Sequence, residues 1–140
     1  MSTERAGYGP DRNKSIDLHD YYACRFVLKK EKKANFEFIC PAHLENTIDI
    51  YSSETLEPTV ERGNYSRSCD PYEQGPYDED RGYYITGWHK RSEVPPDPHI
   101  DWTQSTCRVF ARTEEVVRVG FEDIPGNHNY GAIVCTVRFK

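Results

Sequence analysis

The sequence has no apolar run near the length of a membrane span, and no positively charged start followed by an apolar stretch. It also has no Cys-x-x-Cys pair and no two histidines four residues apart. Those spacings are typical of zinc knuckles, thioredoxin-type redox sites and helical metal sites. We therefore expect no metal centre and no cofactor.

An excess of positive charge is also missing. The 140 residues include 18 Lys and Arg against 23 Asp and Glu, which gives a formal net charge of −5. A general nucleic-acid-binding surface carries excess positive charge to neutralise phosphates, so any phosphate contact here would have to be local. The one basic cluster is Lys29–Lys33. The length indicates a single domain with one compact core.

Cysteine and tyrosine are the informative residues that are present. Five cysteines are spread widely along the chain, which is typical of disulfides in a small secreted protein. We therefore predict a secreted protein from which a signal peptide has been removed. Because five is odd, one thiol stays unpaired or pairs between chains. Ten tyrosines suit strands and surfaces that are partly buried and partly wet.

The N-terminal part is predicted to be a flexible arm followed by a hairpin. Residues 1–17 are mostly polar, contain Gly and Pro and show no period, so we expect an arm ahead of a single domain at 18–140. Apolar residues then alternate over 21–28 and over 36–40, which predicts a β-hairpin. Its tip would carry the basic cluster, as a solvated turn or as a contact surface.

A short helix is predicted next. Pro41 suits the first turn of a helix, and Leu44, Ile48 and Tyr51 recur at helical spacing over 42–51.

A long Pro-, Gly- and Tyr-rich loop is predicted over 54–82, pinned by Cys69. Strands are predicted at 83–88, 106–111, 116–121 and 130–139. This order of hairpin, helix, loop and antiparallel sheet indicates an α+β domain.

Several short motifs carry a resemblance to a known family. They are Tyr22–Cys24 with Cys135 in the last strand, Tyr83–Ile85, Cys107–Phe110 and Gly126–Tyr130. In this order they resemble the fungal guanyl-specific ribonucleases, and still more the ribonuclease-like effectors of powdery mildew fungi. The resemblance implies a twisted antiparallel sheet of the microbial ribonuclease type.

The resemblance also implies a closing disulfide, because these effectors bond the cysteine of their N-terminal Tyr-x-Cys to one near the C-terminus. Cys24 and Cys135 take those places here. The pairing of Cys40, Cys69 and Cys107 stays open, and a bond from Cys69 to either of the other two would pin the long loop.

Cleavage of RNA by its 2′-hydroxyl needs a general base, a general acid and a cation at the phosphate. In the family these are a glutamate, histidine and an arginine. Arg108 matches the arginine, but Ile85 or Thr86 stands at the glutamate position, and no histidine lies on the penultimate strand. The resemblance therefore implies a pseudoenzyme. An active protein would use a rearranged site of His89, Glu93 and Arg108.

The function that the resemblance implies is a secreted virulence effector of a plant-pathogenic fungus. It would be a monomer without membrane contact that binds a host protein or ribosome-associated RNA, and a plant immune receptor could perceive it as an avirulence factor. The expected contact surface combines the basic tip with the Tyr-rich loop 70–84. Its predicted residues are Lys29, Lys30, Lys32, Lys33, Tyr72, Tyr77 and Tyr83, and Trp88 beyond the loop is a further predicted binding residue whose ring could stack on a nucleotide.

Two alternatives remain at this point. One is an active secreted ribonuclease with the rearranged site. The other is an intracellular inhibitor or immunity protein whose five thiols are reduced.

Overall fold

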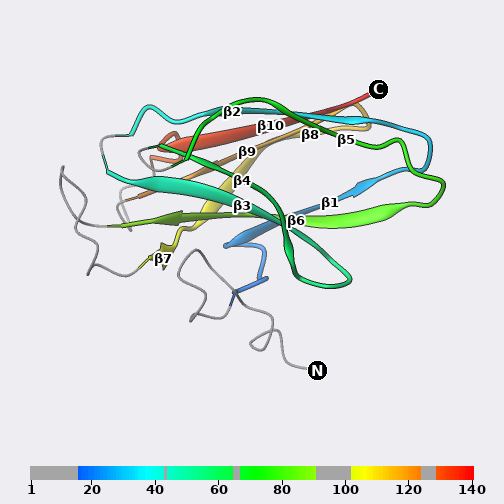
Figure 1. Cartoon of the computed structure of the whole chain (residues 1–140). Helices are drawn as coiled ribbons and strands as arrows, with labels where there is room; N and C mark the ends of the chain where they lie inside the picture. The colour runs from blue at the N-terminus through cyan, green and yellow to red at the C-terminus, as the bar shows by residue number, and fades with distance from the viewer. Residues whose placement is uncertain (1–15, 43, 65–66, 91–101, 124–128) are drawn as a thin grey trace.

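The computed structural model describes residues 16–42, 44–64, 67–90, 102–123 and 129–140, and in these ranges the chain forms strands and no helix (Figure 1). The strands are β1 (Ala23–Leu28), β2 (Ala34–Ile39), β3 (Asn46–Ser52), β4 (Pro58–Gly63), β5 (Tyr72–Gln74), β6 (Arg81–His89), β7 (Thr103–Gln104), β8 (Cys107–Arg112), β9 (Val116–Phe121) and β10 (Ile133–Phe139). Since the described part holds no helix, it offers none that could cross a membrane.

Two antiparallel sheets form a sandwich. The first sheet has the strand order β1-β6-β3-β4, with β7 paired to β6, and the second has the order β5-β2-β10-β9-β8. Figure 1 shows the second sheet above the first, with the strands of both running roughly lengthwise through the view. The predicted α+β class is therefore wrong, because the described residues are all-β.

The core lies between the two sheets and consists of the inward-facing residues of both. Alternation within strands places Phe26 and Leu28 of β1 and Phe36 and Phe38 of β2 in this core, because successive side chains of a strand point to opposite faces. The rings of Phe26 and Phe36 meet with their centroids 6.0 Å apart. Large aromatic rings thus fill the space between the layers.

The predicted N-terminal hairpin is wrong. β1 pairs with β6 in the first sheet, and β2 pairs with β5 and β10 in the second, so the chain crosses from one layer to the other between them. Both strands have an apolar face, and these faces pack on each other across the core instead of lying side by side in one sheet. The basic residues 29–33 occupy this crossing segment.

The predicted helix over 42–51 is also wrong, since the strand β3 occupies most of that stretch. Ile48 and Ile50 point into the core, while Tyr51 points to the outer side of the first sheet and joins a second apolar cluster there. Both faces of β3 are covered, so its side chains are apolar or buried at nearly every position. β-branched residues favour the extended chain at such positions.

The long loop predicted over 54–82 contains two further strands, β4 and β5. The four strands predicted after it correspond to β6, β8, β9 and β10, with ends that differ by at most three residues and agree at both ends for β9. The alternation of apolar residues therefore located these strands correctly, although not their partners.

The predicted disulfide between Cys24 and Cys135 is wrong, because all five cysteines are free thiols in the structure. Cys24, Cys107 and Cys135 are buried in the core as apolar side chains. Burial raises the pKa of the Cys107 thiol to about 12, and it also raises that of Cys24 and Cys135. The fold is therefore held together by packing between the sheets.

The N-terminal arm predicted over 1–17 lies outside the described residues as far as residue 15. Ile16 is only 2% exposed and belongs to the second apolar cluster with Tyr51, Leu56 and Trp88. In Figure 1 this first described segment runs on the side of the first sheet that faces away from the second. A single domain at 18–140 stays a prediction.

Close approach of the sheets requires a glycine at one position. Gly87 of β6 lies opposite Ile48 of β3. A methyl group on Gly87 would overlap the buried ring of Phe121 from the second sheet. Replacement Gly87→Ala should therefore destabilise the protein by about 1–3 kcal/mol, because an overpacked core must shift its side chains and backbone. Urea unfolding of the variant would measure this.

The matched control is Gly131→Ala, where the added methyl would meet Asn129 Oδ1 at an ordinary 3.4 Å. Equal unfolding midpoints for the two variants would contradict the close packing of the sheets at Gly87.

Candidate functional site

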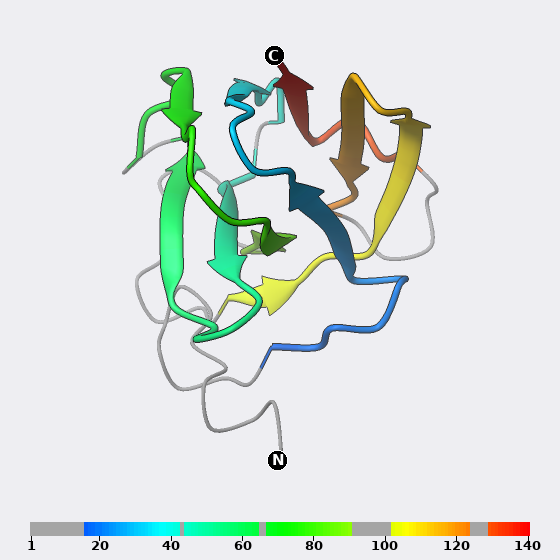
Figure 2. The same ribbon diagram turned by 90° about the vertical axis from the view of Figure 1, so that its right-hand side faces the viewer.

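A cleft of about 960 Å³ opens at one end of the sandwich. It is lined by residues from the end of β1 and the crossing segment after it, from the β8–β9 turn, and from the end of β10. Figure 2 looks onto this end of the molecule, with β1 near the centre and the C-terminus above it. We call it the end cleft. Its volume lies within the range usual for ligand sites.

The floor of the end cleft is apolar and partly aromatic. Phe26 and Val27 of β1, Val117 of β9 and Phe139 of β10 form it. The rings of Phe26 and Phe139 are tilted to each other with centroids 5.8 Å apart. Phe26 is 3% exposed and Phe139 is half-buried, so Phe139 presents more of its ring to the opening.

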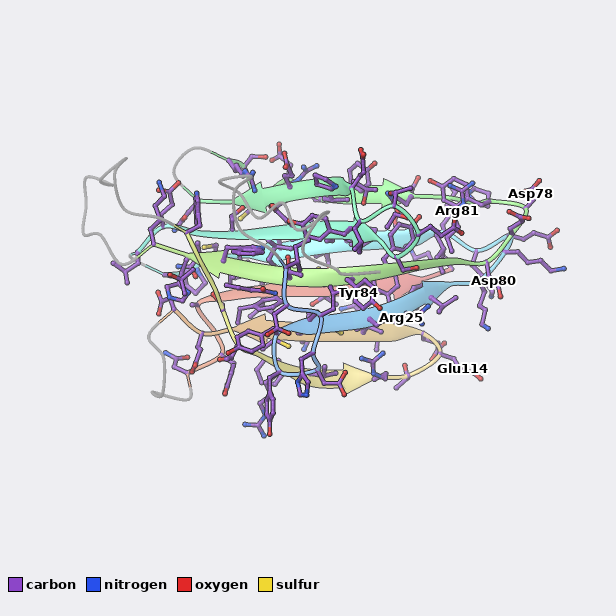
Figure 3. The ribbon with its side chains drawn as sticks, turned by 90° about the horizontal axis from the view of Figure 1, so that it is seen from below. Arg25, Asp78, Asp80, Arg81, Tyr84 and Glu114 are labelled. Atoms are coloured by element: carbon purple, nitrogen blue, oxygen red, sulfur yellow. The ribbon has the colours of Figure 1, made fainter. Side chains whose placement is uncertain are left out.

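Hydrogen-bond acceptors stand on the β8–β9 turn at the mouth. Thr113 fixes this turn, because its backbone N donates to Val116 O at 2.8 Å and its Oγ1 accepts from the backbone N of Glu115 and Val116 at 3.1 Å. Glu114 and Glu115 are exposed and line the cleft. Figure 3 shows Glu114 on this turn, at the same end of the molecule as Asp80 and Arg81.

Cationic donors complete the rim, namely Lys29, Lys32, Arg112 and Lys140. Arg112 donates from Nη1 to Arg25 O at 2.8 Å and from Nη2 to Cys24 Sγ at 3.4 Å. It therefore ties β8, the edge of the second sheet, to β1, the edge of the first, and its guanidinium is held at the side of the cleft. Lys29 Nζ lies 3.8 Å from Asp80 Oδ2, with both side chains largely exposed.

The end cleft can bind a small polar molecule that also has an apolar face. Lysine and arginine only donate hydrogen bonds, ionised carboxylates only accept them, and a hydroxyl such as that of Thr113 can do both. Among the described residues, no group of three or more His, Cys, Asp or Glu is placed to hold a metal ion.

A second groove, of about 760 Å³, lies over the outer face of the second sheet, where Ile39 and Phe110 are exposed. Its polar side chains are already bonded. Arg118 donates from Nε to Thr136 Oγ1 at 3.1 Å, and Glu37 pairs with Arg138 at 3.4 Å just beyond it. The end cleft therefore offers more polar groups to a ligand.

The predicted basic residues divide into two pairs. Lys29 and Lys32 line the end cleft. Lys33 instead pairs with Glu73 on β5 at 3.5 Å, and Lys30 does not line the cleft, although its backbone N donates to Asp80 Oδ1 at 2.8 Å.

The predicted aromatic contact residues do not gather on one surface. Tyr83 is 3% exposed and stacks on Phe26 in the core, and burial raises its pKa to about 12. Trp88 is 1% exposed, and its indole N–H donates to Thr86 Oγ1 at 2.8 Å.

The other two predicted tyrosines are half-buried beneath arginines. The guanidinium of Arg62 lies 5.4 Å from the ring of Tyr72, and that of Arg81 lies 3.8 Å from the ring of Tyr77. Tyr72 and Tyr77 also pack against the core between the sheets, and neither lines the end cleft.

The rearranged catalytic site predicted from sequence is not assembled by the described residues. His89 is 1% exposed on the first sheet, with Nδ1 2.7 Å from Ser105 Oγ, and Ser105 is equally buried. Arg108 is exposed on β8 of the second sheet, 6.0 Å from the ring of Phe110. Glu93 lies outside the described residues.

Sequence reasoning missed most of the end cleft. No sequence motif includes Arg112, Glu114, Glu115 or Phe139. They belong to the second sheet and its β8–β9 turn, and they lie beside the crossing segment because the two sheets are stacked. The basic cluster was the only signal in the sequence that pointed to this region.

The comparisons with known proteins agree with the all-β architecture. No protein-family model matches the chain, and no curated protein matches its sequence. Solved structures do match. The fold is that of three bacterial lectins.

The Chromobacterium violaceum lectin CV2L, solved with alpha-methyl-fucoside, has a TM-score of 0.52 at 10% identity, over 81% of this chain and 92% of that one. The C-terminal domain of the Burkholderia cenocepacia lectin BC2L-C has a TM-score of 0.51 at 14% identity, over 81% and 91%. The high-affinity mannose-binding lectin of Ralstonia solanacearum has a TM-score of 0.50 at 12% identity, over 81% and 92%. At these identities the likeness concerns the fold.

The resemblance to ribonuclease-like effectors is therefore wrong. It implied an N-terminal hairpin of the two first strands, a helix and a closing disulfide, none of which the described residues form, and the fold matches lectins instead. The predicted effector function loses its basis with it, and so do the predicted host-protein, RNA and immune-receptor partners. The same holds for the two alternatives, an active ribonuclease and an intracellular inhibitor or immunity protein. The lectin fold is compatible with the expectation that the chain is not an enzyme, but nothing supports a lost ribonuclease activity.

A buried charged cluster lies on the outer face of the first sheet, away from the end cleft. Asp49 of β3 is 1% exposed and accepts a hydrogen bond from Arg67 Nη1, which also donates to Thr47 Oγ1 at 2.6 Å. Glu61 lies 3.4 Å from Arg67 Nη2. Burial raises the pKa of Asp49 to about 6, because loss of hydration outweighs the attraction of Arg67.

This cluster predicts a pH dependence of stability. The pKa of Asp49 is higher in the folded than in the unfolded chain, so its contribution to stability is complete below about pH 4 and is lost as pH rises through about 6. Relative to the variant Asp49→Asn, the wild type should gain on the order of 2 kcal/mol between pH 7 and pH 4. Urea unfolding of both proteins at several pH values measures it. A difference between them that does not change with pH would contradict the assignment.

Proposed function

We propose that the protein binds carbohydrate without transforming it, and that the end cleft holds the sugar. The observation that carries the proposal is the composition of the cleft, which has an apolar, partly aromatic floor and a rim of donors and acceptors that includes the held guanidinium of Arg112. A sugar ring has an apolar face and a surrounding set of hydroxyls, each of which both donates and accepts. The apolar floor suits the apolar face of the sugar, and the donors and acceptors of the rim suit its hydroxyls.

The lectin fold supports the same proposal. The structural neighbours include lectins described with alpha-methyl-fucoside or as mannose-binding, so fucosides and mannosides are natural first probes. His89, a member of the catalytic site predicted from sequence, is buried beside Ser105 and does not line the cleft.

A glycan array with the labelled protein tests the proposal, followed by calorimetry on the best ligand. We expect binding that Glu114→Ala weakens about tenfold, because a hydrogen bond between a sugar hydroxyl and a carboxylate is lost. The matched control is Glu57→Ala, an exposed glutamate outside the cleft, which should leave affinity unchanged. Absence of binding to any glycan, or equal loss in both variants, would overturn the proposal.

A further inference from the structure

The end cleft has a charge opposite to that of the protein as a whole. The chain carries a formal net charge of −5. The cleft is nevertheless lined by Lys29, Lys32, Arg112 and Lys140 against two carboxylates, Glu114 and Glu115. A concave site with one excess sign of charge attracts ligands of the other sign, since its walls reduce screening.

Three of these four cations, Lys32, Arg112 and Lys140, have no carboxylate partner among the ion pairs of the described residues. Both groups that Arg112 contacts, the Arg25 carbonyl and the Cys24 thiol, are uncharged. In the part of the chain that the structure describes, Lys29 alone of the four has a carboxylate partner, Asp80 at 3.8 Å, and both side chains are largely exposed, so this pair is weak.

Arg112 is also prepared for an anion by its geometry. Its two hydrogen bonds to β1 hold the guanidinium in place, and they occupy two of the five N–H donors that arginine has. A planar fork with free donors suits the two oxygens of a carboxylate. Because the side chain is already ordered, binding loses less conformational entropy.

We propose that the end cleft selects acidic saccharides, in which a hexuronate carboxylate binds at Arg112 and Lys32 while the ring packs on the apolar floor. This inference rests on the proposed function and names the ligand class of the same site. Glu114 and Glu115 then accept hydrogen bonds from the hydroxyls of the ring. The two carboxylates also exclude ligands with negative charge at every position, such as nucleic acid.

Matched sugar pairs test the selection. Calorimetry would compare the methyl glycosides of glucose, galactose and mannose with those of glucuronate, galacturonate and mannuronate, at low and high salt. For at least one pair the uronate should bind about fivefold more tightly or better at low salt, and the advantage should shrink as salt screens the charges.

Variants locate the effect. Lys32→Gln should reduce the advantage of the uronate over its neutral partner several-fold, and Arg112→Gln should reduce that ratio more strongly. Since Arg112 also ties β1 to β8, the exposed Lys32 keeps the test independent of folding. The control is Lys30→Gln, a lysine of the same crossing segment that does not line the cleft, and it should change neither affinity.

The outcomes separate the two proposals. Equal or tighter binding of the neutral member in every pair overturns the selection of acidic sugars while the protein remains a sugar binder. Equal effects of Lys30→Gln and Lys32→Gln overturn the placement of the carboxylate. Absence of binding to both members of every pair overturns the proposed function, and this inference with it.

Discussion

Phe26 and Phe36 lie on consecutive strands, and their rings meet across the space between two sheets. Burial of these large side chains on both layers requires the chain to leave the first sheet after β1 and enter the second at β2. The close approach at Gly87 and Phe121 has the same origin. Without disulfides among the five cysteines, this packing is what fixes the relation of the two layers.

The end cleft follows from the same arrangement. The crossing segment carries its lysines from one layer to the other, and the β8–β9 turn brings carboxylates to the same end. Arg112 joins the two edges through the Arg25 carbonyl and the Cys24 thiol. The contact that ties the sheets at their edge therefore also presents a cation to the end cleft, so stability and the proposed binding share one side chain.

Part of this fold could be predicted from the sequence and part could not. Alternation of apolar residues located β1, β2 and the four later strands, because that pattern depends only on the two faces of each strand. It does not say which strands pair, so β1 and β2 were expected as a hairpin. β3 was mistaken for a helix because Ile48 and Tyr51 are both buried, on opposite faces, and so mimic helical spacing.

The candidate site was less predictable, because its residues come together only through the layering of the sheets. Lys29 and Lys32 were identified from the basic cluster, whereas Phe139 and Arg112 have no local signature. The cysteines led to a wrong prediction, that of disulfide bonds. Their even spacing suggested disulfides, yet Cys24, Cys107 and Cys135 are packed as apolar side chains. Secretion, which was inferred from that spacing, stays a prediction.

The most direct test of the central claim is an NMR titration of the isotope-labelled protein with the saccharide that binds best, following each backbone amide. Binding in the end cleft predicts shifts concentrated at Lys29, Lys32, Arg112 and Glu114. Shifts concentrated instead at Ile39 and Phe110, on the outer face of the second sheet, would place the ligand in the other groove and contradict the account.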